Sequence, residues 1–159
     1  MSLRIAPAAE SDVALIFGFI RKLAEYEKLS HQVVATEDDI RQHVFGANPV
    51  AEVLLAYWGS EAVGFALYFR NFSTFLGQAG IYLEDLFVEP AHRSKGIGKA
   101  LLTRLAKIAV ERGYGRLQWA VLDWNTPSIE FYRSLGAVPL DEWTGYRLNG
   151  EALHRLAGK

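Results

Sequence analysis

The sequence predicts one α/β domain, built on a mixed, mostly antiparallel sheet with helices on both faces. Apolar residues recur at helical spacing in residues 11–29 and 97–111, whereas residues 50–58 and 62–72 read as strands joined by a short turn. The chain has 159 residues, of which 50% are hydrophobic and 22% are charged. Because this length and composition are typical of one globular domain, we expect a single domain over residues 1–159.

The first half of the chain alternates between strand and helix signals. Thr36 and Asp39 resemble a capping box, with Asp in place of the usual Glu, and therefore predict the start of a helix. Gly59 lies in the turn between two predicted strands. The elements expected in this half are strands at residues 3–6, 50–58, 62–72 and 78–88, and helices at residues 11–29 and 36–45.

The second half begins with an amphipathic helix that Gly113 and Gly115 are expected to end. A shorter helix follows, with Thr126 as its predicted N-cap, Pro127 at its first position and Gly136 at its C-terminal stop. The elements expected in this half are helices beginning at residues 97, 126 and 149, and strands at residues 117–122 and 146–148.

Composition excludes several classes of function. The formal net charge is −1 at pH 7, which gives no basis for nonspecific nucleic-acid binding. The chain has no cysteine, which excludes disulfides and a cysteine acyl-enzyme, and we expect a cytoplasmic protein. We expect no signal peptide and no membrane span, since no apolar run approaches roughly 20 residues. The histidines lack metal-ligand spacing, so we expect no metal site at His31, His43, His92 or His154.

The most informative stretch is residues 81–99, where a strand with two adjacent carboxylates leads into a glycine-rich turn and a helix. A helix start of this kind binds phosphate well, because its amides are free and the helix dipole is positive there. The dinucleotide fingerprint fails because Leu101 stands where its third glycine is required. The nucleotide P-loop fails at Arg93 and Ala100. The remaining fit is Arg-x-x-Gly-x-Gly, from Arg93 to Gly98.

This loop resembles the pyrophosphate loop of the GNAT superfamily, the acetyl-CoA-dependent N-acetyltransferases. The motif Asn125-x-Pro127-Ser128-x-x-Phe131-Tyr132, placed after the next strand, strengthens the resemblance. The chain is also similar to the diamine (spermidine/spermine) acetyltransferases, from about Ile5 to about Leu156. The segments that carry this second resemblance include residues 23–27, 32–33, 36–37, 45–46, 48–49, 82–85 and 124–125.

The resemblance implies acetyl-CoA as the cosubstrate and a single-domain GNAT fold. Strand residues would pair with the pantetheine arm, the glycine loop would hold the pyrophosphate, and the start of the short helix would contact the lower part of CoA. The residues implied in cofactor binding are Leu86, Phe87, Val88, Arg93, Ser94, Lys95, Gly96, Ile97, Gly98, Lys99, Asn125 and Ser128.

The chemistry of amine acetylation calls for a base and an acid. An alkyl amine has a pKa of about 10, so only about one molecule in 10³ is neutral and nucleophilic at pH 7. Glu84 is the expected base, directly or through a water, and the resemblance implies that Tyr132 protonates the departing CoA thiolate. Amides at Phe87 and Val88 would polarise the thioester carbonyl. The expected route is direct attack in a ternary complex.

The substrate side of the site is expected to include Tyr26, Glu27, Glu84 and Asp85, the first two by resemblance. In a regular strand, Glu84 and Asp85 point to opposite faces and do not both reach one substrate. Two alternatives follow: a β-bulge re-aims one of the two acids, or Asp85 has another role, such as an ion pair or a place in a dimer interface.

The amine itself is left open by the sequence. Diamine acetyltransferases carry an acid in the loop that matches residues 71–79 and a Glu and a Trp late in the chain, where this sequence has Thr144 and Tyr146. The substrate is therefore expected to be a diamine, a lysine-like amino acid or another small cationic amine. A protein lysine or N-terminus is an alternative, as is a CoA-binding module without catalysis. The resemblance also implies a homodimer.

Overall fold

A five-stranded sheet runs through the part of the chain that ends at Ala120, and residues Val121–Lys159 form a second unit. The computed structural model describes residues 2–159. The strand order is β1-β2-β3-β4-β5, with all neighbours antiparallel except the parallel pair β4 and β5. The strands are β1 Leu3–Pro7, β2 Glu52–Trp58, β3 Glu61–Ser73, β4 Gln78–Val88 and β5 Leu117–Trp119. The predicted mixed, mostly antiparallel sheet is confirmed.

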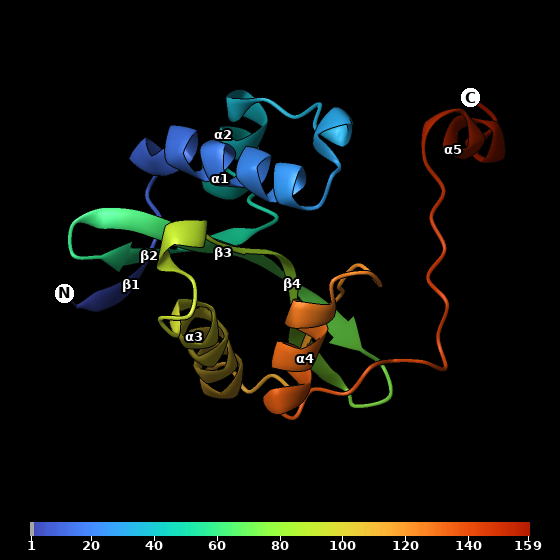
Figure 1. Ribbon diagram of the computed structural model, residues 1–159. Helices are drawn as coiled ribbons and strands as arrows, with labels where there is room; N and C mark the ends of the chain where they lie inside the picture. Colours follow the sequence, from blue (N-terminus) through green and yellow to red (C-terminus); the bar gives the residue numbers. More distant parts are fainter. Residues whose placement is uncertain (1) are drawn as a thin grey trace. The chain divides into compact units, whose positions relative to one another are not determined.

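Helices cover both faces of this sheet, as Figure 1 shows. Two of them, α1 (Val13–Tyr26) and α2 (Glu37–Phe45), lie on one face, and α3 (Ile97–Glu111) lies on the other. Short 3₁₀ turns occur at Glu10–Asp12, Ser30–Gln32 and Pro90–His92.

The core beneath α1 is aromatic as well as aliphatic. Phe19 of α1 stacks on Phe65 of β3 with ring centroids 5.6 Å apart. The ring of Phe87 of β4 lies 6.0 Å from that of Phe19. Burial of each such side chain stabilises the fold by about 1.5–3 kcal/mol. The cluster is completed by Ile16, Leu23, Val53 and Leu55. Because Phe87 belongs to this core cluster, the C-terminal end of β4 is packed firmly against the core.

Local signals placed most helix ends correctly. The capping box is confirmed, with the Asp39 amide donating to Thr36 Oγ1 at 3.2 Å and the Thr36 amide donating to Asp39 Oδ2 at 2.8 Å. The helix predicted over residues 11–29 is shorter, because a 3₁₀ turn precedes Val13 and Lys28 adopts a left-handed conformation with φ of 62°. Because α1 ends at Tyr26, Glu27 lies at the C-terminal end of this helix.

The second unit contains α4 (Thr126–Ser134) and α5 (Gly150–Ala157). The predicted N-cap Thr126 is wrong, because Asn125 caps α4 by accepting a hydrogen bond from the Ser128 amide at 3.4 Å. Gly136 follows α4 with φ of 88°, as expected of a helix stop.

Two strand predictions in the second half need correction. The strand expected over residues 117–122 ends at Trp119, and no strand forms over residues 146–148 in the described chain. Tyr146 and Leu148 have strand-like alternation, but a strand also requires a pairing partner, which no local signal supplies.

Candidate active site

A β-bulge interrupts β4 at its two adjacent acids. Asp85 lies opposite Leu67 of β3, and Leu83 lies opposite Tyr68, so Glu84 has no opposite residue. Two residues of β4 therefore face one step of β3, which is the definition of a bulge. Of the two alternatives left open by the sequence, the bulge is confirmed, and simple alternation no longer separates Glu84 from Asp85.

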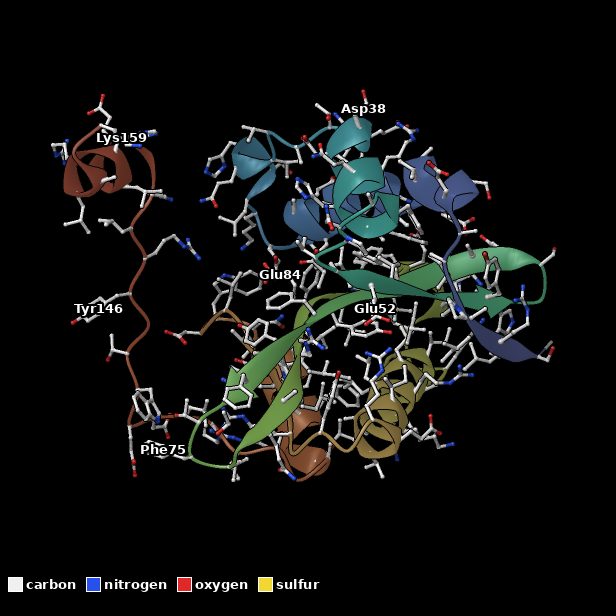
Figure 2. All side chains as sticks on the ribbon, turned by 180° about the vertical axis from the view of Figure 1, so that it is seen from behind. Asp38, Glu52, Phe75, Glu84, Tyr146 and Lys159 are labelled. Carbon is white, nitrogen blue, oxygen red and sulfur yellow. The ribbon has the colours of Figure 1, made fainter. Side chains whose placement is uncertain are left out.

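Pairing across the bulge shows which face the acids take. Directly paired residues share a face of a sheet, and Leu67, the partner of Asp85, packs against the core beneath α1. Asp85 therefore points to the α1 face, while Glu84 is exposed on the bulge. Figure 2 shows Glu84 on the side of the sheet that carries α1 and α2. The C-cap of α1 is Glu27, which brings a third carboxylate to this place.

The three acids also influence one another electrostatically. Burial first, and then the charges of Glu84 and Glu27, together raise the pKa of Asp85 to about 7. The pKa of Glu27 is raised first by burial and then by Glu84. We refer to Glu27, Glu84 and Asp85 as the carboxylate cluster. Because like charges crowd there, the cluster favours a cation.

The backbone beyond the bulge offers free hydrogen-bonding groups. Pairing of β4 with β5 stops at Leu83 and Trp119, whereas pairing with β3 continues to Val88. The Glu89 amide donates to the Val63 carbonyl at 2.7 Å, and successive strand amides point to alternate sides. The Leu86 and Val88 amides therefore face the open edge. The Phe87 amide faces β3, so the alternation favours Val88 as a donor to a ligand at that edge.

The glycine loop, residues 93–99, opens α3 directly after the turn Pro90–His92. Ser94 and Gly96 both have positive φ, 66° and 78°, which curls the chain before Ile97. The first intrahelical bond is donated by Ala100 to the Gly96 carbonyl at 2.9 Å. The earlier amides of the first turn lack acceptors within the helix, so the loop presents an anion site of the kind that the sequence predicts.

Arg93 ties this loop to the carboxylate side of the site. Its Nε donates to the Val88 carbonyl at 3.0 Å, and its guanidinium carbon lies 4.9 Å from the centre of the Tyr26 ring and 5.6 Å from that of Phe87. Such cation–π contacts are worth about 0.5–1 kcal/mol each at exposed sites. Arg93 thus holds the start of the loop against the end of α1, and the pyrophosphate contact expected of it stays a prediction.

Comparison with known proteins identifies the family. The Acetyltransferase (GNAT) family model matches residues 20–137. The chain belongs to the GNAT acetyltransferase family. It is 43% identical to the thialysine N-epsilon-acetyltransferase of Mus musculus, over 99% of both chains. It is 32% identical to the spermidine/spermine N(1)-acetyltransferase-like protein 1 of Homo sapiens, over 97% of this chain and 24% of that protein. An integron cassette protein of V. cholerae has a similar structure, with a TM-score of 0.83 and 30% identity over 100% and 99% of the two chains.

The GNAT assignment confirms the superfamily, the fold class and an N-acetyltransferase activity. The likeness to diamine acetyltransferases holds as well, since a thialysine acetyltransferase and a spermidine/spermine acetyltransferase-like protein are among the relatives.

Three residues of the GNAT signature lie in the second unit. Asn125 and Ser128 form the N-terminal cap of α4, and the Tyr132 ring lies 5.6 Å from that of Phe131. The hydrogen bond that caps α4 gives Asn125 and Ser128 a structural role. Their cofactor contacts and the acid role of Tyr132 stay predictions.

Two residues that lie near the carboxylate cluster or the end of β4 were not singled out by sequence reasoning. Burial and the charge of Glu84 raise the pKa of the Tyr82 hydroxyl, so Tyr82 lies close to the cluster. Gly64 faces Val88, and a Cβ on Gly64 would approach the Phe87 carbonyl oxygen to 2.7 Å. An isolated glycine inside a strand is a signal of such close approach and was available in the sequence.

Residues 2–159 contain neither a candidate metal centre nor a candidate membrane-spanning helix. Among residues 2–159, no group of three or more His, Asp or Glu side chains is arranged to hold a metal ion. No helix in this range has the length and apolar character that crossing a bilayer requires.

Proposed function

We propose that the chain transfers the acetyl group of acetyl-CoA to a primary amine of a small cationic substrate, by direct attack in a ternary complex. The observation that carries this proposal is the β4 bulge, which brings Glu84 and Asp85 to one site with Glu27. That site adjoins an open strand edge, and the glycine loop begins where the same strand ends. One region therefore attracts a cation while the next suits a phosphate-bearing ligand.

The residues present fit acetyl-CoA as the cosubstrate. The edge groups of Leu86 and Val88 suit the amide-bearing pantetheine arm, and the first-turn amides at Ile97 to Lys99 suit a diphosphate. When bound, acetyl-CoA supplies an acetyl thioester whose carbonyl oxygen the Val88 amide would polarise. A Cβ on Gly98 would lie 4.0 Å from Val88 Cγ2, so the loop and this edge are adjacent.

The proton transfers that the reaction requires determine the catalytic roles of the remaining residues. Glu84 takes a proton from the substrate ammonium, directly or through a water, which frees the nitrogen lone pair. The N–C bond to the acetyl carbon forms, the nitrogen loses its second proton to solvent, and the C–S bond breaks. Tyr132 donates a proton to the departing sulfur and regains one from solvent. The balance is one amide, one thiol and one released proton, with no acyl-enzyme.

The substrate class that we propose is a lysine-like amino acid, with diamines as the second candidate. The mouse relative acts on thialysine, a lysine analogue, and matches at higher identity than the spermidine/spermine-like relative. Residues 71–79 also lack the acid that a longer polycation would engage. Glu27 and Asp85 would hold the cationic substrate while Glu84 serves its reacting amine.

We also propose a cytoplasmic homodimer. The second unit exposes several large apolar side chains, namely Val138, Trp143, Tyr146 and Leu156, and burial of such side chains is one way in which protein interfaces are stabilised. Light scattering should give twice the 17.8 kDa chain mass. A species of single-chain mass at all micromolar concentrations would contradict the dimer.

The activity test is a thiol-release assay with acetyl-CoA and a panel of thialysine, lysine, putrescine, spermidine and an aminoglycoside. We expect the highest kcat/KM with thialysine or lysine and the lowest with the aminoglycoside. Thiol release that no amine stimulates would remove the proposed function. Preference for spermidine would replace the lysine-like amino acid with a polyamine as the proposed substrate, while acetyl transfer to an amine would still hold.

A further inference from the structure

An aromatic pair lies beside the carboxylate cluster and takes no part in the proton transfers. Phe69 of β3 and Tyr82 of β4 are opposite each other in the sheet, and their rings stack with centroids 5.3 Å apart and an interplanar angle of 28°. Both side chains are half-buried, and neither is a member of the core cluster that residues 2–159 form beneath α1. The pair therefore keeps part of its ring surface accessible to a ligand.

The alternation of β3 places this pair on the same face of the sheet as the carboxylate cluster. Phe69 follows Leu67 by two residues, so the two side chains share a face. Leu67 packs against the core beneath α1 and is the partner of Asp85. The pKa of the Tyr82 hydroxyl, which is raised by burial and then by Glu84, agrees with this placement. Tyr82 and Asp85 thus flank Glu84 on the α1 face.

The geometry of attack directs the body of the substrate toward this pair. The thioester is expected at the Val88 amide, on the C-terminal side of the bulge, so an amine that attacks it from Glu84 extends toward the other side. Tyr82 lies on that side, two residues before Glu84 and about 7 Å away along the strand. The stem of a lysine-like amino acid, about four atoms long, is able to lie over the ring.

The chemistry of such a stem suits an aromatic surface. The face of an aromatic ring is negative, which attracts the methylene groups next to an ammonium. A thioether sulfur makes a further favourable contact with an aromatic ring at about 5 Å. In thialysine a sulfur replaces one methylene of the lysine stem, so this substrate gains a contact that lysine lacks.

We propose that the Phe69–Tyr82 pair binds the stem of the amine substrate and favours a thioether over a methylene there. Tyr82 is therefore a residue that determines specificity for thialysine over lysine. The inference rests on the proposed function, because it concerns the same amine site. It adds the part of the site that recognises the substrate between its charged ends.

The test measures the ratio of kcat/KM for thialysine to kcat/KM for lysine, at saturating acetyl-CoA and a fixed pH. The reacting amine of thialysine is a weaker base than that of lysine, and this difference contributes equally in every variant. Tyr82→Leu replaces the ring by an aliphatic side chain and should lower the ratio about threefold, as expected for loss of a sulfur–aromatic contact. Tyr82→Phe keeps the ring and should keep the ratio. Phe69→Leu should lower the ratio about twofold.

Phe72→Leu is the matched control. Phe72 lies on β3 as well, three residues after Phe69, so it points to the opposite face of the sheet, and it is exposed. This variant should keep the ratio of the unaltered protein. Urea unfolding shows whether each variant is folded, and Phe69→Leu provides the same test should Tyr82→Leu not fold.

The outcomes separate this inference from the proposed function. A Tyr82→Leu variant with an unchanged ratio would overturn the inference and leave acetyl transfer to a lysine-like amine in place. Equal loss of kcat/KM for both amines would also overturn it, because it indicates a structural effect rather than contact with the stem. Absence of amine-dependent thiol release by the unaltered protein would remove the proposed function and this inference with it.

Discussion

The carboxylate cluster at the β4 bulge and the glycine loop that opens α3 suit ligands of opposite charge. They do so by different physical means. The cluster relies on burial and on like charges forced together at Glu27, Glu84 and Asp85. The loop relies on backbone amides and on exposed cations such as Lys99. The cluster is consequently sensitive to pH, and the loop is sensitive to backbone conformation and to salt.

The largest expected effect is on stability, through Asp85. Its pKa is raised from 3.8 to about 7, so its favourable contribution is complete below about pH 4 and is lost as the pH rises through 7. A rise in pKa of this size corresponds to at most about 4 kcal/mol. Asp85→Asn should therefore unfold like the unaltered protein near pH 4 and be more stable by up to that amount at pH 8, in urea titrations. Asp141→Asn, at an exposed acid of the second unit, is the control and should follow the unaltered protein throughout. A stability difference between Asp85→Asn and the unaltered protein that does not change with pH would contradict a buried, crowded carboxyl.

The next effect is on catalysis, through Glu84. Loss of a general base costs about 10²–10⁴ in rate, so Glu84→Gln should lower kcat/KM for the amine at least about 100-fold. Glu25→Gln removes an exposed acid of α1 and should keep the unaltered rate. Initial-rate assays over pH 6–10 measure both variants. Equal rates for Glu84→Gln and Glu25→Gln would assign the base to another residue.

The glycine loop should respond to backbone strain rather than to pH. Gly96 has φ of 78°, with nothing within 4 Å of an added Cβ, so Gly96→Ala is penalised by conformation alone, by about 1–2 kcal/mol. Gly18 also has open space around a Cβ but lies inside α1, where Ala is favoured by about 1 kcal/mol. Urea unfolding should thus move in opposite directions for the two variants. A stabilised Gly96→Ala would show that the left-handed turn is not required.

The smallest effect is that of salt. Exposed charges are screened within about 8 Å at physiological ionic strength, whereas buried pairs are screened much less. Raising salt from 0.05 to 0.5 M should weaken acetyl-CoA binding several-fold and leave the transition of the Asp85 difference curve near pH 7. Calorimetry and urea unfolding at both salt concentrations measure the two quantities. Equal sensitivity of both regions to salt would abolish the contrast drawn between them.

The sequence predicted what local chemistry determines. The Thr36 capping box, the amphipathic α3 and the glycine-rich turn that opens it follow from residues within a few positions of one another. The arrangement of the acids did not follow, because the bulge depends on how β4 registers with β3. Alternation alone placed Glu84 and Asp85 on opposite faces, and the extra residue against Leu67 changed that.

The second unit shows the same limit. Residues around Thr126 predicted a helix correctly, but the choice of cap depended on which side chain reached the Ser128 amide. Tyr146 lies in a segment with the alternation of a strand, but this segment pairs with no other strand of the described residues. The family match at residues 20–137 includes parts of both units, and a single domain over residues 1–159 stays a prediction.

The central claim is that an amine bound at the carboxylate cluster, once it has lost a proton, attacks an acetyl thioester held along the open edge of β4. Initial-rate kinetics with both thialysine and acetyl-CoA varied test it most directly. The account predicts double-reciprocal lines that intersect, as a ternary complex requires. Parallel lines, together with an acetylated protein detected by mass spectrometry before amine is added, would contradict direct attack.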